Sequence, residues 1–117
     1  ALPGPTALIP ALTASALPSD RFVFEGFLPK KQGRQTRLTT LADEPRTVVL
    51  YESPHRLLRT LEDLIEHFGA DRRAAVAREL TKKYEEVERG TLKEVRSYFG
   101  GYKKVRGECV VVVDGAS

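Results

Sequence analysis

The sequence predicts an α/β fold, a three-layer-like sandwich in which helices flank a mixed sheet of about five strands. Three observations support this prediction. Short apolar stretches rich in Val, Phe and Tyr alternate with segments whose leucines recur at helical spacing. Between residues 74 and 89, two strand-like stretches follow each other with no helix between them. The length of 117 residues suits one ordinary domain.

The predicted strands rest on β-propensity and on continuous apolar runs. Residues 22–27 read FVFEGF, which is dense in β-branched and aromatic side chains. Residues 46–51 and 107–114 are apolar almost throughout, as expected for strands that are covered on both faces. Two further strands are expected at 74–79 and 84–89, where a short polar turn would join them as a hairpin.

The third of four predicted helices is the clearest. Ser53 is its expected N-cap, Pro54 its first helical residue and Gly69 its stop signal. One apolar face is formed by Leu57, Leu58, Leu61, Leu64, Ile65 and Phe68.

The other predicted helices are shorter. A helix capped by Thr6, or by the Pro-Gly-Pro turn before it, is expected within residues 3–17, and another at about 35–42. The last helix should begin at a capping box, with Thr91 as N-cap and Glu94 three residues later. A glycine pair after residue 99 should end it.

Composition narrows the class of protein. Hydrophobic residues make up 41% and charged residues 30%, which suits a soluble globular domain. No apolar run approaches the ~20 residues that cross a bilayer, and no leader pattern opens the sequence. The single cysteine, Cys109, lies in the run ECVVVV, so we expect a buried structural thiol. We therefore expect a cytoplasmic protein that does not associate with membranes.

The net charge of +3 permits an anionic partner such as RNA without requiring one. Lys30, Lys31, Arg34 and Arg37 form one basic cluster that is suited to phosphate contacts, although a merely solvated surface explains it equally well. His55 and His67 are too isolated to complete a metal site with Cys109, so no metal is expected, and His67 should be an ordinary surface residue.

Two polar clusters remain as candidate sites. The corner 51–56, YESPHR, lies between a predicted strand and a predicted helix, which is where open α/β sheets bind ligands. Glu52 there could accept hydrogen bonds from a ribose or an amine, or could form a local ion pair with Arg56. The second cluster, 77–86, joins Arg78 and Glu79 to a lysine pair at 82–83. A lysine there suits proton abstraction from a hydroxyl, but the residues alone favour a charged hairpin with cross-strand ion pairs.

Four long blocks carry a resemblance to a known family. They are PGPTALIPALTASALPSDRFVFEGFLPKK, VVLYESPHRLLRTLEDL, VARELTKKYEEVERGTL and GECVVVVDG, in this order. Over residues 2–115 the chain resembles the second domain of the tetrapyrrole (corrin/porphyrin) methylases, the class III S-adenosylmethionine methyltransferases. The resemblance implies that residues 1–117 are a single C-terminal domain, that an N-terminal domain with a glycine-rich cofactor loop is absent, and that S-adenosyl-L-methionine binds between the two domains.

The resemblance also implies a reaction. The branch of the family with these blocks methylates the ribose 2′-hydroxyl of a cytidine in 16S rRNA, so the small ribosomal subunit is the expected partner. Other branches methylate carbons of corrin or porphyrin rings, which is the first alternative. As a second alternative, this piece by itself acts only as a dimerisation or RNA-docking module. Family members are usually homodimers, and we expect the same here.

The family motifs suggest candidate site residues when they are carried over to this sequence. One such segment is 107–108, at a strand end, which we expect near the cofactor. Lys82 is the expected catalytic residue, with Arg78 and Glu79 as its orienting partners. The expected cofactor-binding residues are Pro5, Thr6, Tyr51, Glu52, Ser53 and Ala77.

Overall fold

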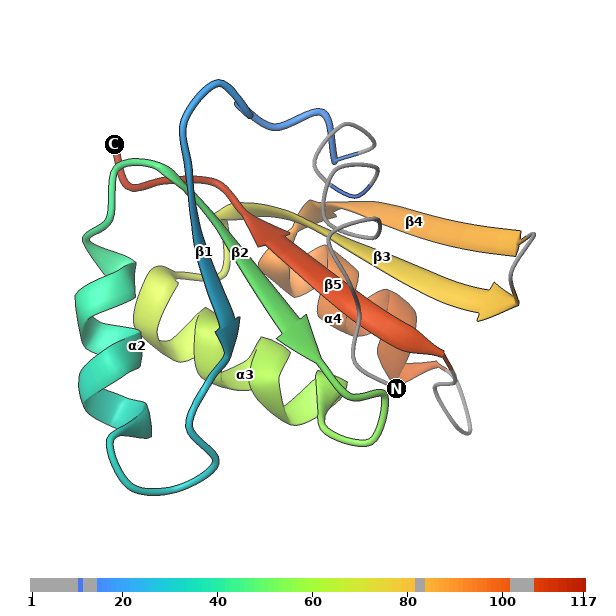
Figure 1. Cartoon of the computed structure of the whole chain (residues 1–117), viewed down its shortest axis with the longest axis horizontal. Coiled ribbons are helices and arrows are strands. Elements are labelled where there is room, and N and C mark those ends of the chain that lie inside the picture. The colour runs from blue at the N-terminus through green and yellow to red at the C-terminus, as the bar shows by residue number, and fades with distance from the viewer. Residues whose placement is uncertain (1–10, 12–14, 82–83, 102–106) are drawn as a thin grey trace.

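A five-stranded sheet forms the centre of the chain, and helices α2, α3 and α4 pack against it (Figure 1). The computed structural model describes residues 11, 15–81, 84–101 and 107–117. In chain order the elements are β1 (Phe22–Phe27), α2 (Arg34–Ala42), β2 (Thr47–Glu52), α3 (Leu57–Phe68), β3 (Arg73–Thr81), β4 (Tyr84–Thr91), α4 (Leu92–Gly100) and β5 (Glu108–Val113).

The sheet is mixed, as predicted. The strand order is β1-β2-β5-β3-β4. β1 and β2 are parallel and are joined through α2, whereas β5 runs antiparallel to both of its neighbours, β2 and β3. β3 and β4 form the predicted antiparallel hairpin. Since β5 is antiparallel to both, β2 and β3 run in the same direction and their C-terminal ends lie at the same edge of the sheet.

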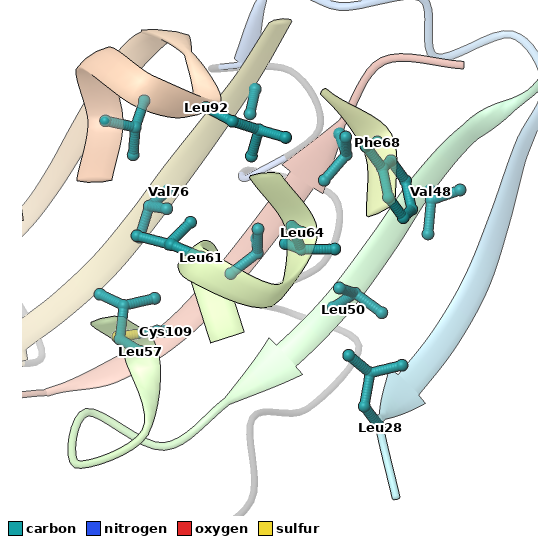
Figure 2. Packing of buried hydrophobic residues seen from close by; sticks show 14 of the residues in the cluster. Leu28, Val48, Leu50, Leu57, Leu61, Leu64, Phe68, Val76, Leu92 and Cys109 are labelled. Carbon is teal, nitrogen blue, oxygen red and sulfur yellow. The ribbon is translucent and has the colours of Figure 1, made fainter. Parts of the chain in front are cut away.

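The main core lies between the sheet and α2, α3 and α4, which all cover one face. The leucines of α3 at positions 57, 61 and 64 are fully buried against strand residues such as Val76 and Leu50 (Figure 2). The opposite face has a smaller apolar cluster, in which Ala11 and Leu17 pack with residues of β2 and β5. The predicted burial of Cys109 is confirmed, because this side chain belongs to the main core.

Most predicted boundaries are confirmed, but the predicted start of α3 is wrong. This helix begins at Leu57, with Arg56 at the N-cap position and no side-chain cap. The N–H of Arg56 donates to the carbonyl of Ser53 at 3.1 Å, which closes a four-residue turn with Pro54 in the second position. Proline is favoured there because its fixed φ matches the turn, so Ser53-Pro54 marks a turn before the helix and not its cap.

Both strands of the hairpin extend about two residues further than expected, to Thr81 and Thr91. The capping box of α4 is confirmed in both directions, since Thr91 accepts from the Glu94 N–H and Glu94 accepts from the Thr91 N–H. Gly69 ends α3 as predicted, with a φ of 98° that other residues rarely adopt. The predicted N-terminal helix lies almost entirely outside the described residues. None of the helices in the described ranges is long and apolar enough to span a membrane.

Candidate functional site

The polar strand ends predicted from the sequence meet at one edge of the sheet. Cys109 at the start of β5 pairs with Glu52 at the end of β2 on one side and with Arg78 of β3 on the other. Glu108 pairs in turn with Glu79. The corner 51–56 and the segment at the end of β3 are therefore neighbours, separated by the width of one strand.

A pocket of about 500 Å³ opens at this edge, between the ends of β1 and β2 and the start of β5. Its lining combines two carboxylates, two cationic side chains and an apolar wall. The lining residues are Phe27, Leu28, Lys30, Glu52, Ser53, Arg56 and Glu108. Such a pocket can bind a ligand that has both an apolar ring and hydrogen-bond donors.

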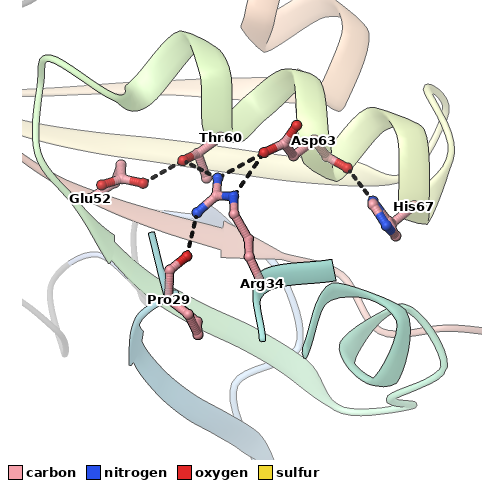
Figure 3. Close-up of polar contacts among 6 residues, drawn as sticks. All are labelled: Pro29, Arg34, Glu52, Thr60, Asp63 and His67. Atoms are coloured by element: carbon pink, nitrogen blue, oxygen red, sulfur yellow. Dashed lines mark hydrogen bonds and ion pairs between the residues drawn. The ribbon is translucent and has the colours of Figure 1, made fainter. Parts of the chain in front are cut away.

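Glu52 is the most buried of the charged side chains around the pocket, with 6% of its surface exposed. One carboxylate oxygen accepts the Ser53 N–H at 2.9 Å, and the other accepts the hydroxyl of Thr60 from α3 (Figure 3). The local ion pair with Arg56 that the sequence left open is not found among the described residues. Both hydrogen bonds to the Glu52 carboxylate therefore come from neutral donors.

The basic cluster 30–37 does not present four free cations. Arg34 is only 4% exposed and forms an ion pair with Asp63 of α3 at 2.9 Å. Arg37 forms an ion pair with Glu25 of β1. Lys30 and Lys31 are exposed, and Lys30 also lines the pocket. A phosphate-contact surface in this region would therefore depend on the two lysines.

Alternation along the strands separates the predicted cofactor-binding residues. Glu52 and Ser53 line the pocket, whereas Tyr51 and Ala77 lie in the apolar cluster on the opposite face. The ring of Tyr51 contacts Phe24 and Phe27 edge-on, with centroids 5.0 and 5.8 Å away. Pro5 and Thr6 lie outside the described residues.

The second predicted cluster has a cross-strand ion pair, as the residues by themselves favoured. Arg78 is 4% exposed, pairs in register with Glu86 of β4, and contacts its carboxylate at 3.1 Å. The guanidinium also lies 5.9 Å from the centre of the Phe99 ring. Glu79 follows on β3, opposite Glu85 and Glu108 in register. Lys82 lies outside the described residues.

Burial controls the chemistry of the cysteine between these clusters. Desolvation raises the pKa of the Cys109 thiol to about 12, and the nearby Arg78 opposes this effect only in part. A thiol with this pKa is protonated at neutral pH and is a poor nucleophile. Within the described part of the chain, no group of three or more His, Cys, Asp or Glu residues could hold a metal ion.

Sequence reasoning missed the roles of three polar residues behind the pocket. Thr60 and Asp63 were not singled out, and Arg34 was not expected to be buried. Thr60 had a recognisable signal, because it occupies the leucine-rich face of α3, one position before Leu61. A hydroxyl on such a face must find a partner when it is buried. That partner, Glu52, could not be identified without the tertiary structure.

The chain is thus an α/β domain with a pocket at one edge of its sheet. Comparison with known families gives the class: residues 1–96 match the family model described as Tetrapyrrole (Corrin/Porphyrin) Methylases. The chain belongs to this family.

Three curated relatives are similar along almost the whole chain, and each is named ribosomal RNA small subunit methyltransferase I. The protein of Pseudomonas aeruginosa is 51% identical over 116 residues, covering 97% of this chain and 41% of the relative. Those of Xylella fastidiosa strain Temecula1 and of Synechocystis are each 52% identical over 99% of this chain, covering 43% and 42% of the relatives. The chain thus spans about two-fifths of the length of these relatives.

Solved structures show the same fold at low sequence identity. A cobalt precorrin-4 methyltransferase of cobalamin biosynthesis has a TM-score of 0.69 at 18% identity, covering 96% of this chain and 50% of that one. Uroporphyrin-III C-methyl transferase from Thermus thermophilus, solved with S-adenosyl homocysteine, has a TM-score of 0.56 at 21% identity. This second match covers 89% of this chain and 48% of that one.

Proposed function

We propose that this chain forms one wall of the active site of an S-adenosylmethionine-dependent methyltransferase that methylates 16S rRNA. The observation that carries the proposal is about 50% identity, over nearly the whole chain, to relatives named ribosomal RNA small subunit methyltransferase I. The proposed target is the 2′-hydroxyl of a cytidine ribose. The other wall would come from an N-terminal domain with a glycine-rich loop, in the part of the relatives that this chain does not cover.

The residues around the pocket suit a nucleoside cofactor. Glu52 offers a buried carboxylate to hydroxyl or ammonium donors, and Phe27 and Leu28 offer an apolar wall to a purine ring. When bound, the cofactor would supply the methyl group from its sulfonium. Tyr51, Ser53, Ala77, Pro5 and Thr6 remain proposed cofactor-side residues, although Tyr51 and Ala77 would have to act from the opposite face of the sheet.

Transfer to a ribose hydroxyl requires alignment, exclusion of water and help with the hydroxyl proton. We assign the proton-accepting or charge-stabilising role to Lys82, which follows the end of β3. Arg78 and Glu79 would orient it. The ion pair with Glu86 holds the guanidinium of Arg78 in place, which is consistent with a role as a fixed positive charge.

The RNA would approach the same edge of the sheet. Lys30 and Lys31 are exposed beside the pocket and are the proposed phosphate contacts. The proposed assembly is a cytoplasmic homodimer that binds the small ribosomal subunit. The names of the relatives support the rRNA partner, whereas the cytoplasmic homodimer rests on the resemblance to the family.

A labelling experiment with the full-length protein that contains this chain tests the proposal. The protein is incubated with radiolabelled S-adenosylmethionine and either under-methylated small ribosomal subunits or a uroporphyrinogen and precorrin pool. We expect the unmodified protein to place label in rRNA ribose. The Lys82→Ala variant should not. Label in the tetrapyrrole pool alone would contradict the rRNA proposal. Residues 1–117 alone should show no turnover, because the proposed second wall of the cofactor site is not part of them.

A further inference from the structure

A continuous chain of hydrogen bonds connects α2, through α3, to the carboxylate in the pocket (Figure 3). Arg34 Nη2 donates to Thr60 Oγ1 at 3.0 Å, and Thr60 Oγ1 donates to Glu52 Oε1. Both Arg34 and Thr60 are buried, the latter with 1% of its surface exposed. These contacts join residues that are 26 and 8 positions apart in sequence.

The direction of each hydrogen bond in this chain is determined by chemistry. A guanidinium has only donors, so the hydroxyl oxygen of Thr60 must accept from Arg34. The single hydroxyl proton is then left for Glu52, whose oxygen must accept it. The second Glu52 oxygen is occupied by the Ser53 N–H. Glu52 is thus held as an acceptor, and successive bonds of this kind polarise and strengthen one another.

Arg34 also holds the opposite wall of the pocket. Its Nη1 donates to the carbonyl of Pro29 at 3.0 Å. Pro29 lies between Leu28 and Lys30, which line the pocket together with Glu52. A single guanidinium therefore contacts the loop after β1 directly and reaches Glu52 of β2 through Thr60.

The charges favour a role at the pocket over a purely structural one. Asp63 neutralises Arg34, through contacts of 2.9 Å from both Nε and Nη2. Glu52 forms no ion pair with any residue that the structure describes. The network therefore fixes the position of the Glu52 carboxylate beside the pocket without an ion pair to it.

We propose that Arg34 and Thr60 are positioning residues that hold the Glu52 carboxylate as a hydrogen-bond acceptor for hydroxyl or ammonium groups of the nucleoside cofactor. This inference rests on the proposed function, because it assumes that the pocket takes such a cofactor. Neither residue touches the ligand; both act through Glu52.

The first experiment measures binding of S-adenosylhomocysteine to the full-length protein by titration calorimetry. Thr60→Val keeps the shape of the side chain and removes the hydroxyl, so binding should weaken roughly tenfold, as expected for one hydrogen bond to a charged group. Thr60→Ser restores the hydroxyl and should bind nearly as the unmodified protein does. Equal affinities for all three proteins would overturn the inference.

Thr47→Val is the matched control. Thr47 is also buried, and its hydroxyl donates to the carbonyl of Pro18 at the other end of β2. The same substitution there removes a buried hydroxyl far from the pocket and should leave the affinity unchanged. If Thr47→Val weakens binding as much as Thr60→Val, the effect reports general loosening of the fold and the inference is wrong.

A double-variant cycle tests whether Thr60 acts through Glu52. Glu52→Gln should weaken binding by itself, and adding Thr60→Val to it should have little further effect, because the group that Thr60 positions has been replaced. Additive losses would show that Thr60 acts independently and would contradict the inference. Failure of the unmodified protein to bind S-adenosylhomocysteine would instead overturn the proposed function. Binding that is insensitive to Thr60 overturns the positioning role alone.

Discussion

The two faces of the sheet differ in the burial of their polar and aromatic side chains. One face is covered by α2, α3 and α4, and the other is not. On the helix-covered face, Glu52, Thr60, Arg34 and Arg78 are buried and have polar partners supplied by the helices or by β4. On the opposite face Tyr51 is buried, but Phe24 and Phe27 beside it are 47% and 43% exposed. Among the described residues, the buried charged side chains thus lie on the face that the helices cover, and their partners come from α3 or from β4.

A bulge in β1 produces the aromatic cluster on the opposite face. The register shifts between Phe24 and Gly26, and Gly26 has a φ of 75°. In a regular strand, residues three apart point to opposite faces, but the extra residue brings both phenylalanines against Tyr51. The contrast between the faces therefore depends on one backbone irregularity as well as on composition.

The largest expected difference concerns Cys109, which the helix-covered face encloses. A pKa of about 12 against the ordinary 9.0 reduces the thiolate population roughly thousandfold, and burial also blocks access. We expect negligible reaction with a thiol reagent at pH 8 in the folded chain and rapid reaction in denaturant. Rapid labelling without denaturant would mean that this face opens readily.

Truncating one apolar side chain on each face compares how much the two faces contribute to stability. Leu61→Ala removes a fully buried side chain from the helix-covered face and should lower the free energy of unfolding by about 3 kcal/mol. Phe24→Ala on the opposite face should lower it by less than about 1 kcal/mol, since nearly half of that ring is already in water. Urea unfolding curves measure both, and equal losses would contradict the proposed contrast.

The buried ion pair should show a smaller effect that can be partly reversed. Arg34→Met leaves Asp63 without its cation and should lower the free energy of unfolding by about 2 kcal/mol, less than for a fully buried pair because Asp63 is partly exposed. The double variant Arg34→Met/Asp63→Leu should recover part of this loss, because no uncompensated charge remains. A double variant less stable than the single one would show that Asp63 has another stabilising partner.

The capping box of α4 should have the smallest effect. Thr91→Ala should lower the free energy of unfolding by about 1 kcal/mol, as loss of an N-cap usually does. Hydrogen bonds from Thr91 also lower the pKa of Glu94 below its usual 4.5. A lowered pKa stabilises the fold above the unfolded-state value and ceases to do so as the pH falls through the folded-state value.

Acid titration of unfolding checks the sign of this effect. Part of the loss of stability below about pH 4.5 should be absent in Glu94→Gln, whose side chain cannot titrate. Glu44 is a useful comparison, because its pKa is lowered by Arg46, two positions further along the chain and just before β2. Glu44→Gln should reduce the loss of stability in the same pH range, and its effect should be independent of that of Glu94→Gln. An identical acid profile in all three proteins would exclude both contributions.

The sequence by itself determined the elements of this fold, because the signals for them are local. The apolar face of α3, the strand at 22–27, the Thr91–Glu94 capping box and the stop at Gly69 depend on residues within a few positions of one another. The sequence also determined that Cys109 is buried, because its neighbours form a continuous apolar run that is typical of a strand covered on both faces. Kinship indicated the family, and the family model matches most of the chain.

The tertiary structure alone decided which polar residues form a site. Strand order brought the end of β2 beside the start of β5, and alternation along β2 sent Tyr51 and Glu52 to opposite faces. Folding buried Arg34, which looked like a surface cation, because a helix 29 positions away supplies Asp63. The sequence could not indicate these pairings, because a hydrogen bond between distant residues depends on topology and leaves no periodic signal.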